Sequence, residues 1–145
     1  RKAERIMWEK RFPVYAQWKK DINKIYRKRG YIETHTGFRY SGYMGRNDAT
    51  NYQTQGTAFH CLLYTLIKIN KISKREKWKS KIIGQIYDSI IFDLVPDEQN
   101  YIIETVNKVG TIDIREDFDW INVPLSIDFE VTPVDGAWNE KEEVK

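Results

Sequence analysis

The apolar positions of the first thirty residues recur at intervals of three and four, which is the spacing of an amphipathic helix. They are Ile6, Phe12, Tyr15, Trp18, Ile22, Ile25 and Tyr26. Pro13 should break this helix into two pieces, and Gly30 should end it as a C-terminal cap. Residues 31–41 are then predicted as short β structure with a tight turn at Gly37, and residues 42–50 as a loop that leads into a helix.

A second helical pattern runs from about residue 51 to residue 72 with a wide apolar face, and residues 73–80 form a charged connection. Two short apolar stretches follow, Ile82-Ile83 and Ile90-Ile91-Phe92. They predict a β-hairpin whose two-residue connection is Asp88-Ser89, with the carboxylate of Asp88 at its tip. A carboxylate held on a turn can bind a divalent cation, but Asp is also an ordinary turn residue.

The last third of the chain predicts helices and one strand. Pro96-Asp97 should begin a helix that runs to about residue 108, with Asp97 as its N-cap. Another short helix could start at Thr111-Ile112-Asp113. Residues 125–131 alternate apolar and polar side chains, the pattern of a half-buried strand, and the tail after Trp138 should fray. Together these elements predict an α+β fold in which a helical region precedes a small antiparallel sheet.

Length and composition are those of a folded chain with one core. The 145 residues include 41% hydrophobic and 14% aromatic side chains. The longest apolar runs are only a few residues long, so we expect no membrane span, and we expect no signal segment at the start. The single cysteine, Cys61, excludes an internal disulfide and fits a reducing compartment.

The charge is unevenly distributed along the chain. Residues 1–80 carry 19 Lys and Arg against 6 Asp and Glu, whereas residues 81–145 carry 5 against 15. The basic half could bind a phosphate backbone, or it could simply present solvated helix faces. The acidic half could hold metal ions or face a basic partner surface.

Five sequence blocks occur in a fixed order. They are Arg29-Gly-Tyr-Ile-Glu-Thr34 with Gly37-Phe-Arg39, Asn51 with Gln55-Gly-Thr-Ala58, Gln85-Ile-Tyr-Asp-Ser89, Val95-Pro-Asp-Glu98, and Val123-Pro-Leu125. In this order and at these distances they resemble the C-terminal part of a family A DNA polymerase, the bacterial polymerase I and phage type. The resemblance implies part of a right-hand polymerase fold, with residues 1–80 as a fingers-like helical region. Residues 81–145 would be a palm segment with the catalytic hairpin and a C-terminal strand.

The same resemblance assigns roles to the hairpin residues. Asp88 matches the catalytic, metal-binding aspartate of the family. Tyr87 stands where the family usually has His, next to the primer terminus, and Ser89 stands where it usually has Glu. The resemblance therefore implies two Mg²⁺ ions that Asp88 shares with an aspartate of a partner chain.

It also implies contacts with DNA. Asn51 and Gln55 lie four residues apart, so they share a helix face and match positions that contact the primer–template. Without that role, Asn51 would be a helix cap and Gln55 a solvent-facing side chain. Gly56 beside them would let a backbone or a nucleic-acid strand approach closely.

Three arginines are the expected phosphate contacts. Arg29 and Arg39 flank the first block and could bind phosphates through paired hydrogen bonds. Arg46 lies one residue away from the position where the family has a basic residue before Asn51. Phe38 replaces an arginine that is common in the family, so we expect a weaker grip on the template strand.

Several family parts do not occur in the sequence: the strand with the second catalytic aspartate, the fingers helix that holds the triphosphate, the thumb and any exonuclease domain. We therefore expect the C-terminal part of a divided polymerase, inactive without an N-terminal partner chain, that acts on primer–template DNA and dNTPs in the cytoplasm of a bacterium or of a phage-infected cell. Ser89 also resembles single-subunit RNA polymerases, which is one alternative. A non-catalytic nucleic-acid-binding module is another.

Overall fold

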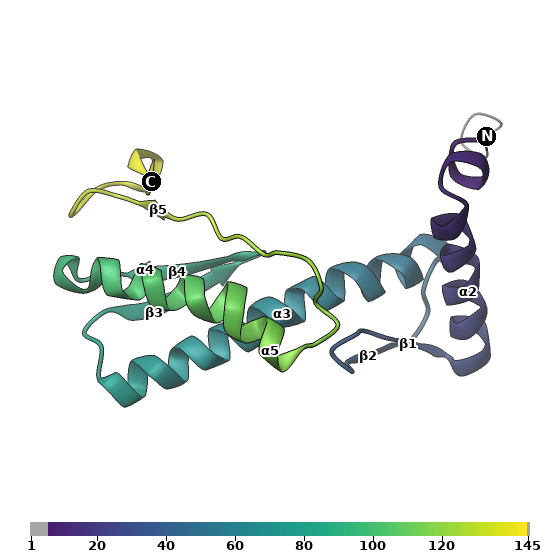
Figure 1. Cartoon of the computed structure of the whole chain (residues 1–145), viewed down its shortest axis with the longest axis horizontal. Coiled ribbons are helices and arrows are strands. Elements are labelled where there is room, and N and C mark those ends of the chain that lie inside the picture. The colour runs from purple at the N-terminus through teal and green to yellow at the C-terminus, as the bar shows by residue number, and fades with distance from the viewer. Residues whose placement is uncertain (1–5, 145) are drawn as a thin grey trace. The chain divides into compact units, whose positions relative to one another are not determined.

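The computed structural model describes residues 6–144, and the chain divides by packing into two compact units, residues 1–60 and 61–145 (Figure 1). The division falls inside the long helix α3 (Arg46–Glu76). The boundary expected between residues 80 and 81 rests on charge and resemblance rather than on packing, and it stays a prediction. No helix in the described part of the chain is long and apolar enough to span a membrane.

The first unit begins with a helix, as its apolar pattern predicts. A single π-helical turn covers Met7–Arg11, and α2 covers Pro13–Arg29 with the proline in its first turn. Gly30 ends α2 in the left-handed conformation (φ 75°), and its N–H donates to the Tyr26 carbonyl at 2.8 Å. The break at Pro13 and the cap at Gly30 are thus confirmed. Glycine suits the cap because only a residue without Cβ adopts this φ at little cost.

A short antiparallel hairpin follows. Its strands are β1 (Tyr31–Glu33) and β2 (Arg39–Ser41), and Ile32 pairs with Tyr40. The hairpin packs on α2, where Ile22 and Ile32 are buried together with Met44 and Ala49.

Helix α3 is longer than its apolar pattern indicates. It begins at Arg46, before the predicted start at residue 51, and the side chain of Asp48 accepts a hydrogen bond from the Gly45 N–H at 2.9 Å. It ends at Glu76, four residues beyond the last periodic apolar position. Lys and Arg are good helix formers, so a solvated helical turn continues after the buried face has ended.

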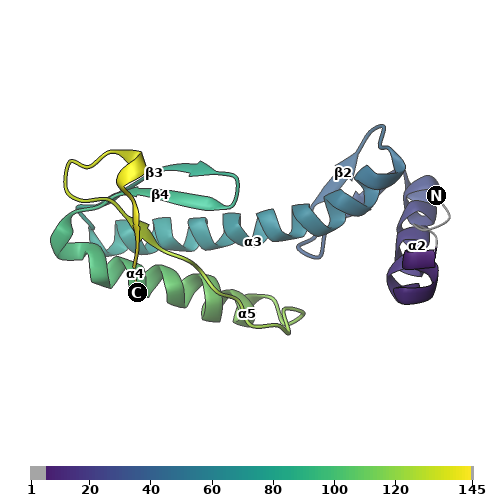
Figure 2. The ribbon, with the colours of Figure 1, turned by 90° about the horizontal axis from the view of Figure 1, so that it is seen from above.

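The second unit packs a β-hairpin against helices (Figure 2). Its elements are β3 (Lys81–Ile86), β4 (Ser89–Asp93), a 3₁₀ turn (Pro96–Glu98), α4 (Gln99–Lys108), a π-helical turn (Val109–Asp113) and α5 (Ile114–Asp117). The core joins Ile69 of α3 to Ile102 and Val106 of α4, and Ile90 and Phe92 of β4 pack against them. One face of the hairpin is therefore anchored to two helices.

Three expectations for the later part of the chain were wrong. Asp97 does not cap α4, because no side-chain cap bond is present and α4 begins after the 3₁₀ turn. The predicted strand 125–131 shrinks to β5 (Glu130–Val131), since alternation reports burial and not pairing. The tail pairs with β5 through β6 (Glu142–Glu143), where fraying was expected.

Candidate functional site

The hairpin tip differs from the prediction by one residue. Ile86 pairs with Ser89, so the two-residue connection is Tyr87-Asp88, and Ser89 is the first residue of β4. Tyr87 has a φ of 51°, a value that tight hairpin turns require at the first of their two central residues. Asp88 therefore remains at the tip, as expected, but it is the second residue of the connection rather than the first.

The conformation of Tyr87 is strained and supported from within the hairpin. A left-handed φ costs a residue with a side chain on the order of 1–3 kcal/mol. Burial does not offset this cost, because Tyr87 is 88% exposed. The side-chain Nε2 of Gln85 instead donates to the Tyr87 carbonyl at 2.7 Å. Gln85 is a positioning residue whose role sequence reasoning missed, although Gln85 belongs to one of the sequence blocks.

The Asp88 side chain is exposed, and within residues 6–144 it makes no hydrogen bond or ion pair. A carboxylate oxygen is a suitable ligand for a hard divalent cation such as Mg²⁺. The described residues contain no group of three or more His, Cys, Asp or Glu side chains that could hold a metal. Within residues 6–144, this tip thus offers one carboxylate ligand and not a complete metal site.

A second set of contacts ties both ends of the hairpin together. The Glu98 carboxylate accepts hydrogen bonds from the N–H groups of Lys79 at 3.0 Å and Ser80 at 2.8 Å, just before β3. The Ser80 hydroxyl accepts one from the Val95 N–H at 2.8 Å, just after β4. These N–H donors hold the pKa of Glu98 below its usual value. Glu98 had a place in the sequence blocks, but its structural role was not predicted.

Asn51 and Gln55 are both exposed, and they lie one turn apart in α3. Asn51 is in the second turn of the helix, so it is not the cap that the alternative interpretation required. Gly56 is buried against a ring: a Cβ on it would lie 2.8 Å from the Tyr40 side chain. The close approach predicted at Gly56 is therefore made by Tyr40, which corrects the expectation of a backbone or nucleic-acid strand there.

The three candidate arginines have different surroundings. Arg29 is exposed at the last position of α2. Arg39 donates from Nε to the Glu33 carboxylate at 2.6 Å and lies 4.9 Å from the Tyr31 ring centre. This contact with Glu33 raises the pKa of Arg39 and orients its guanidinium. The side chain of Arg46 lies outside the described residues.

Similarity to known proteins extends over nearly the whole chain. The sequence matches the model of DNA polymerase family A over residues 3–139. It is 29% identical over 114 residues to the DNA polymerase of Bacillus phage SP01, a match that covers 71% of this chain and 12% of that protein. It is 27% identical over 130 residues to the DNA polymerase I of Lactococcus lactis subsp. lactis (strain IL1403), and this match covers 81% of this chain and 14% of that protein.

The fold is also similar to a solved structure. The POL domain of Pol1 from M. smegmatis, in a complex with a DNA primer–template and dNTP, aligns with a TM-score of 0.65 and 22% identity. The alignment covers 76% of this chain and 21% of that one. The expected α+β fold, as part of a right-hand polymerase, is confirmed. The chain spans between 12% and 14% of the length of the two polymerases above.

Proposed function

The chain belongs to DNA polymerase family A, and from this premise we propose that it forms the C-terminal part of a template-dependent DNA polymerase. It would complete the active site together with an N-terminal partner chain that carries the rest of the palm, the fingers helix and the thumb.

In the proposed reaction the primer 3′-hydroxyl oxygen bonds to the α-phosphorus of a dNTP. The bond from that phosphorus to the bridging oxygen breaks, pyrophosphate leaves with the electron pair, and the hydroxyl proton passes to solvent. Two Mg²⁺ ions would stabilise the charge on the attacking and leaving oxygens. Asp88 would bind them together with an aspartate of the partner chain.

The other site residues would position the substrates. Tyr87 would lie next to the primer terminus, and Ser89 would be a neutral neighbour of the metal site. The remaining candidates, Asn51, Gln55, Arg29, Arg39 and Arg46, would contact the primer–template.

The observation that supports this proposal most is the hairpin tip itself. The Asp88 carboxylate is exposed and without a partner in residues 6–144, and it lies on a turn that Gln85 supports. A carboxylate that served only the turn would bond to the backbone of that turn, as turn-forming Asp residues do.

Primer extension tests the proposal. The chain is mixed with a polypeptide that carries the missing family parts, and extension of a primed DNA template is measured with dNTPs and with rNTPs. We expect extension with dNTPs by the mixture and none by either chain alone. Preference for rNTPs would favour the RNA polymerase alternative, and DNA binding without any extension would favour a non-catalytic module.

A further inference from the structure

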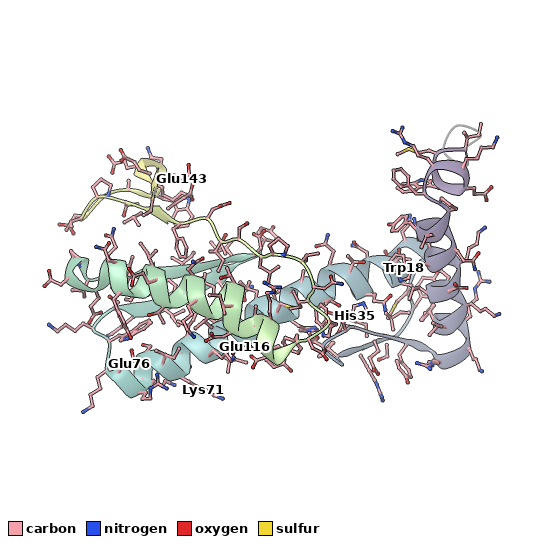
Figure 3. The ribbon with its side chains drawn as sticks, in the orientation of Figure 1. Trp18, His35, Lys71, Glu76, Glu116 and Glu143 are labelled. Carbon is pink, nitrogen blue, oxygen red and sulfur yellow. The ribbon has the colours of Figure 1, made fainter. Side chains whose placement is uncertain are left out.

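Four rings form a contiguous cluster in the first unit, which we call the aromatic platform: Phe38, Tyr40, Tyr52 and His60. Tyr40 and Tyr52 stack nearly parallel, with ring centres 4.9 Å apart and planes at 10°. Phe38 meets Tyr40 edge-on at 4.9 Å and lies 4.6 Å from His60. The platform therefore joins the β1–β2 hairpin to the part of α3 that belongs to the same unit. Figure 3 labels His35, which lies in the loop between β1 and β2.

Hydrogen bonds hold two members of the platform, His60 and Phe38. His60 is buried, and its Nδ1 lies 3.1 Å from the Thr36 hydroxyl. The backbone of Phe38 is bonded on both sides to Thr34, because its N–H donates to the Thr34 hydroxyl at 3.1 Å and its carbonyl accepts from the Thr34 N–H at 2.8 Å. These bonds fix the backbone of Phe38, and its ring packs against Tyr40 and His60.

Two rings of the platform are exposed to solvent. Phe38 is 51% exposed and Tyr52 is 41% exposed, although both rings pack against Tyr40. Exposed aromatic rings that are held by neighbouring rings are what sequence-tolerant stacking of nucleobases uses, since every base has a π face.

The charge around the platform is complementary to a nucleic acid. The first unit carries 13 Lys and Arg against 5 Asp and Glu. Arg39 directly follows Phe38, and its contacts with Glu33 and Tyr31 orient it. A purely apolar partner would gain nothing from these cations, whereas a polyanion with accessible ring faces uses both features.

We propose that the aromatic platform binds single-stranded DNA, with an unpaired base stacked on Phe38 and an adjoining phosphate next to Arg39. A duplex hides the faces of its bases, so the ligand is a single strand. The inference rests on the proposed function in one respect, namely that DNA is the ligand of this chain. It adds a stacking site for an unpaired base to the polar contacts assigned above.

Binding of two oligonucleotides by the full chain tests the proposal. Fluorescence anisotropy compares a labelled dT20 strand with a strand of the same length in which abasic sites replace the bases. We expect dT20 to bind at least about fivefold more tightly, the ratio that one modest base–ring stack provides. Phe38→Leu should abolish this difference and leave the affinity for the abasic strand unchanged, whereas Phe38→Trp should preserve it.

Tyr43→Leu is the matched control, because Tyr43 is a fully exposed ring of the same unit outside the platform. This variant should retain the preference for dT20. Equal binding of the two strands by the unaltered chain, or equal losses in Phe38→Leu and Tyr43→Leu, would overturn the stacking site while leaving DNA binding intact. Failure of the unaltered chain to bind either strand at low salt would overturn the proposed DNA binding as well.

Discussion

At the scale of single residues, Gly56 and Tyr40 depend on each other. Alanine favours a helix over glycine by about 1 kcal/mol, but a Cβ at Gly56 would lie 2.8 Å from a ring that Tyr52 and Phe38 hold in place. Overpacking of this kind costs on the order of 1–3 kcal/mol. We expect Gly56→Ala to lower the free energy of unfolding in the native chain and to raise it in a Tyr40→Ala background. Denaturant titration of the four proteins checks this, and the same sign in both backgrounds would contradict it.

A second residue-scale prediction concerns Gln85. Gln85→Ala removes the hydrogen bond to the Tyr87 carbonyl, which is worth roughly 0.5–1.5 kcal/mol, and frees the strained turn to relax. In the reconstituted enzyme we expect the extension rate to fall by up to about tenfold, with unchanged affinity for primer–template. Ser89→Ala is the control, because it keeps the turn contact and should have little effect. An unaltered rate in Gln85→Ala would show that the turn does not need this support.

At the scale of elements, the end of α3, where Figure 3 labels Glu76, is joined to α4 by the hydrogen bond that the Tyr101 hydroxyl donates to Glu76. Hydrogen bonds from Arg75, Tyr101 and Trp78, in order of effect, lower the pKa of Glu76 from 4.5 to about 2. A lowered folded-state pKa stabilises the fold above pH 4.5, and this stabilisation is lost as the pH falls through about 2. Glu76→Gln should therefore lower the Tm at neutral pH, with a difference from the native chain that closes between pH 4.5 and 2.

The control for this pH series is Glu104→Gln. Glu104 is an exposed residue of α4 that makes no hydrogen bond or ion pair within residues 6–144. Its substitution should leave the Tm of the native chain nearly unchanged at every pH. A constant Tm difference for Glu76→Gln across the acid range would show that these contacts do not depend on the charge of Glu76.

The sequence predicted elements best where local chemistry decides them. The cap at Gly30 needs one residue without Cβ, and the hairpin around Asp88 needs two apolar stretches and a short connection, so both were found. The position of the turn was missed by one residue because a tyrosine with positive φ is not a turn signal. The prediction of a strand over residues 125–131 was wrong in its length, because strand pairing here depends on β6, which comes later in the sequence and pairs only with Glu130–Val131.

The candidate site was predictable only in part, for the same reason. Asp88 was found from its motif, and the structure places it at an exposed hairpin tip. The Glu98 carboxylate accepts hydrogen bonds from Lys79 and Ser80, which lie 19 and 18 positions before it in the sequence. No local sequence pattern predicts a contact over that distance. The packing of Tyr40 on Gly56 likewise depends on tertiary structure.

At the scale of the whole molecule, the basic half should dominate DNA binding. If its cations contact phosphates, the affinity for primer–template falls steeply with salt, by a slope of about 0.9 per contact on a double-logarithmic plot. Replacement of the exposed pair Lys24 and Lys28 on α2 by Gln should reduce this slope by about one to two. Lys81→Gln in β3 should leave the slope unchanged. Equal slopes in all three proteins would mean that α2 presents only a solvated face.

The central claim is that Asp88 binds catalytic metal ions, and one measurement tests it most directly. Asp88→Asn keeps the shape of the side chain and removes its charge. In the reconstituted enzyme, single-turnover extension should slow by several orders of magnitude, with each tenfold loss worth about 1.4 kcal/mol of transition-state stabilisation, while the affinity for primer–template changes little. Near-normal extension by Asp88→Asn would show that Asp88 is only a turn residue and that the active site lies elsewhere.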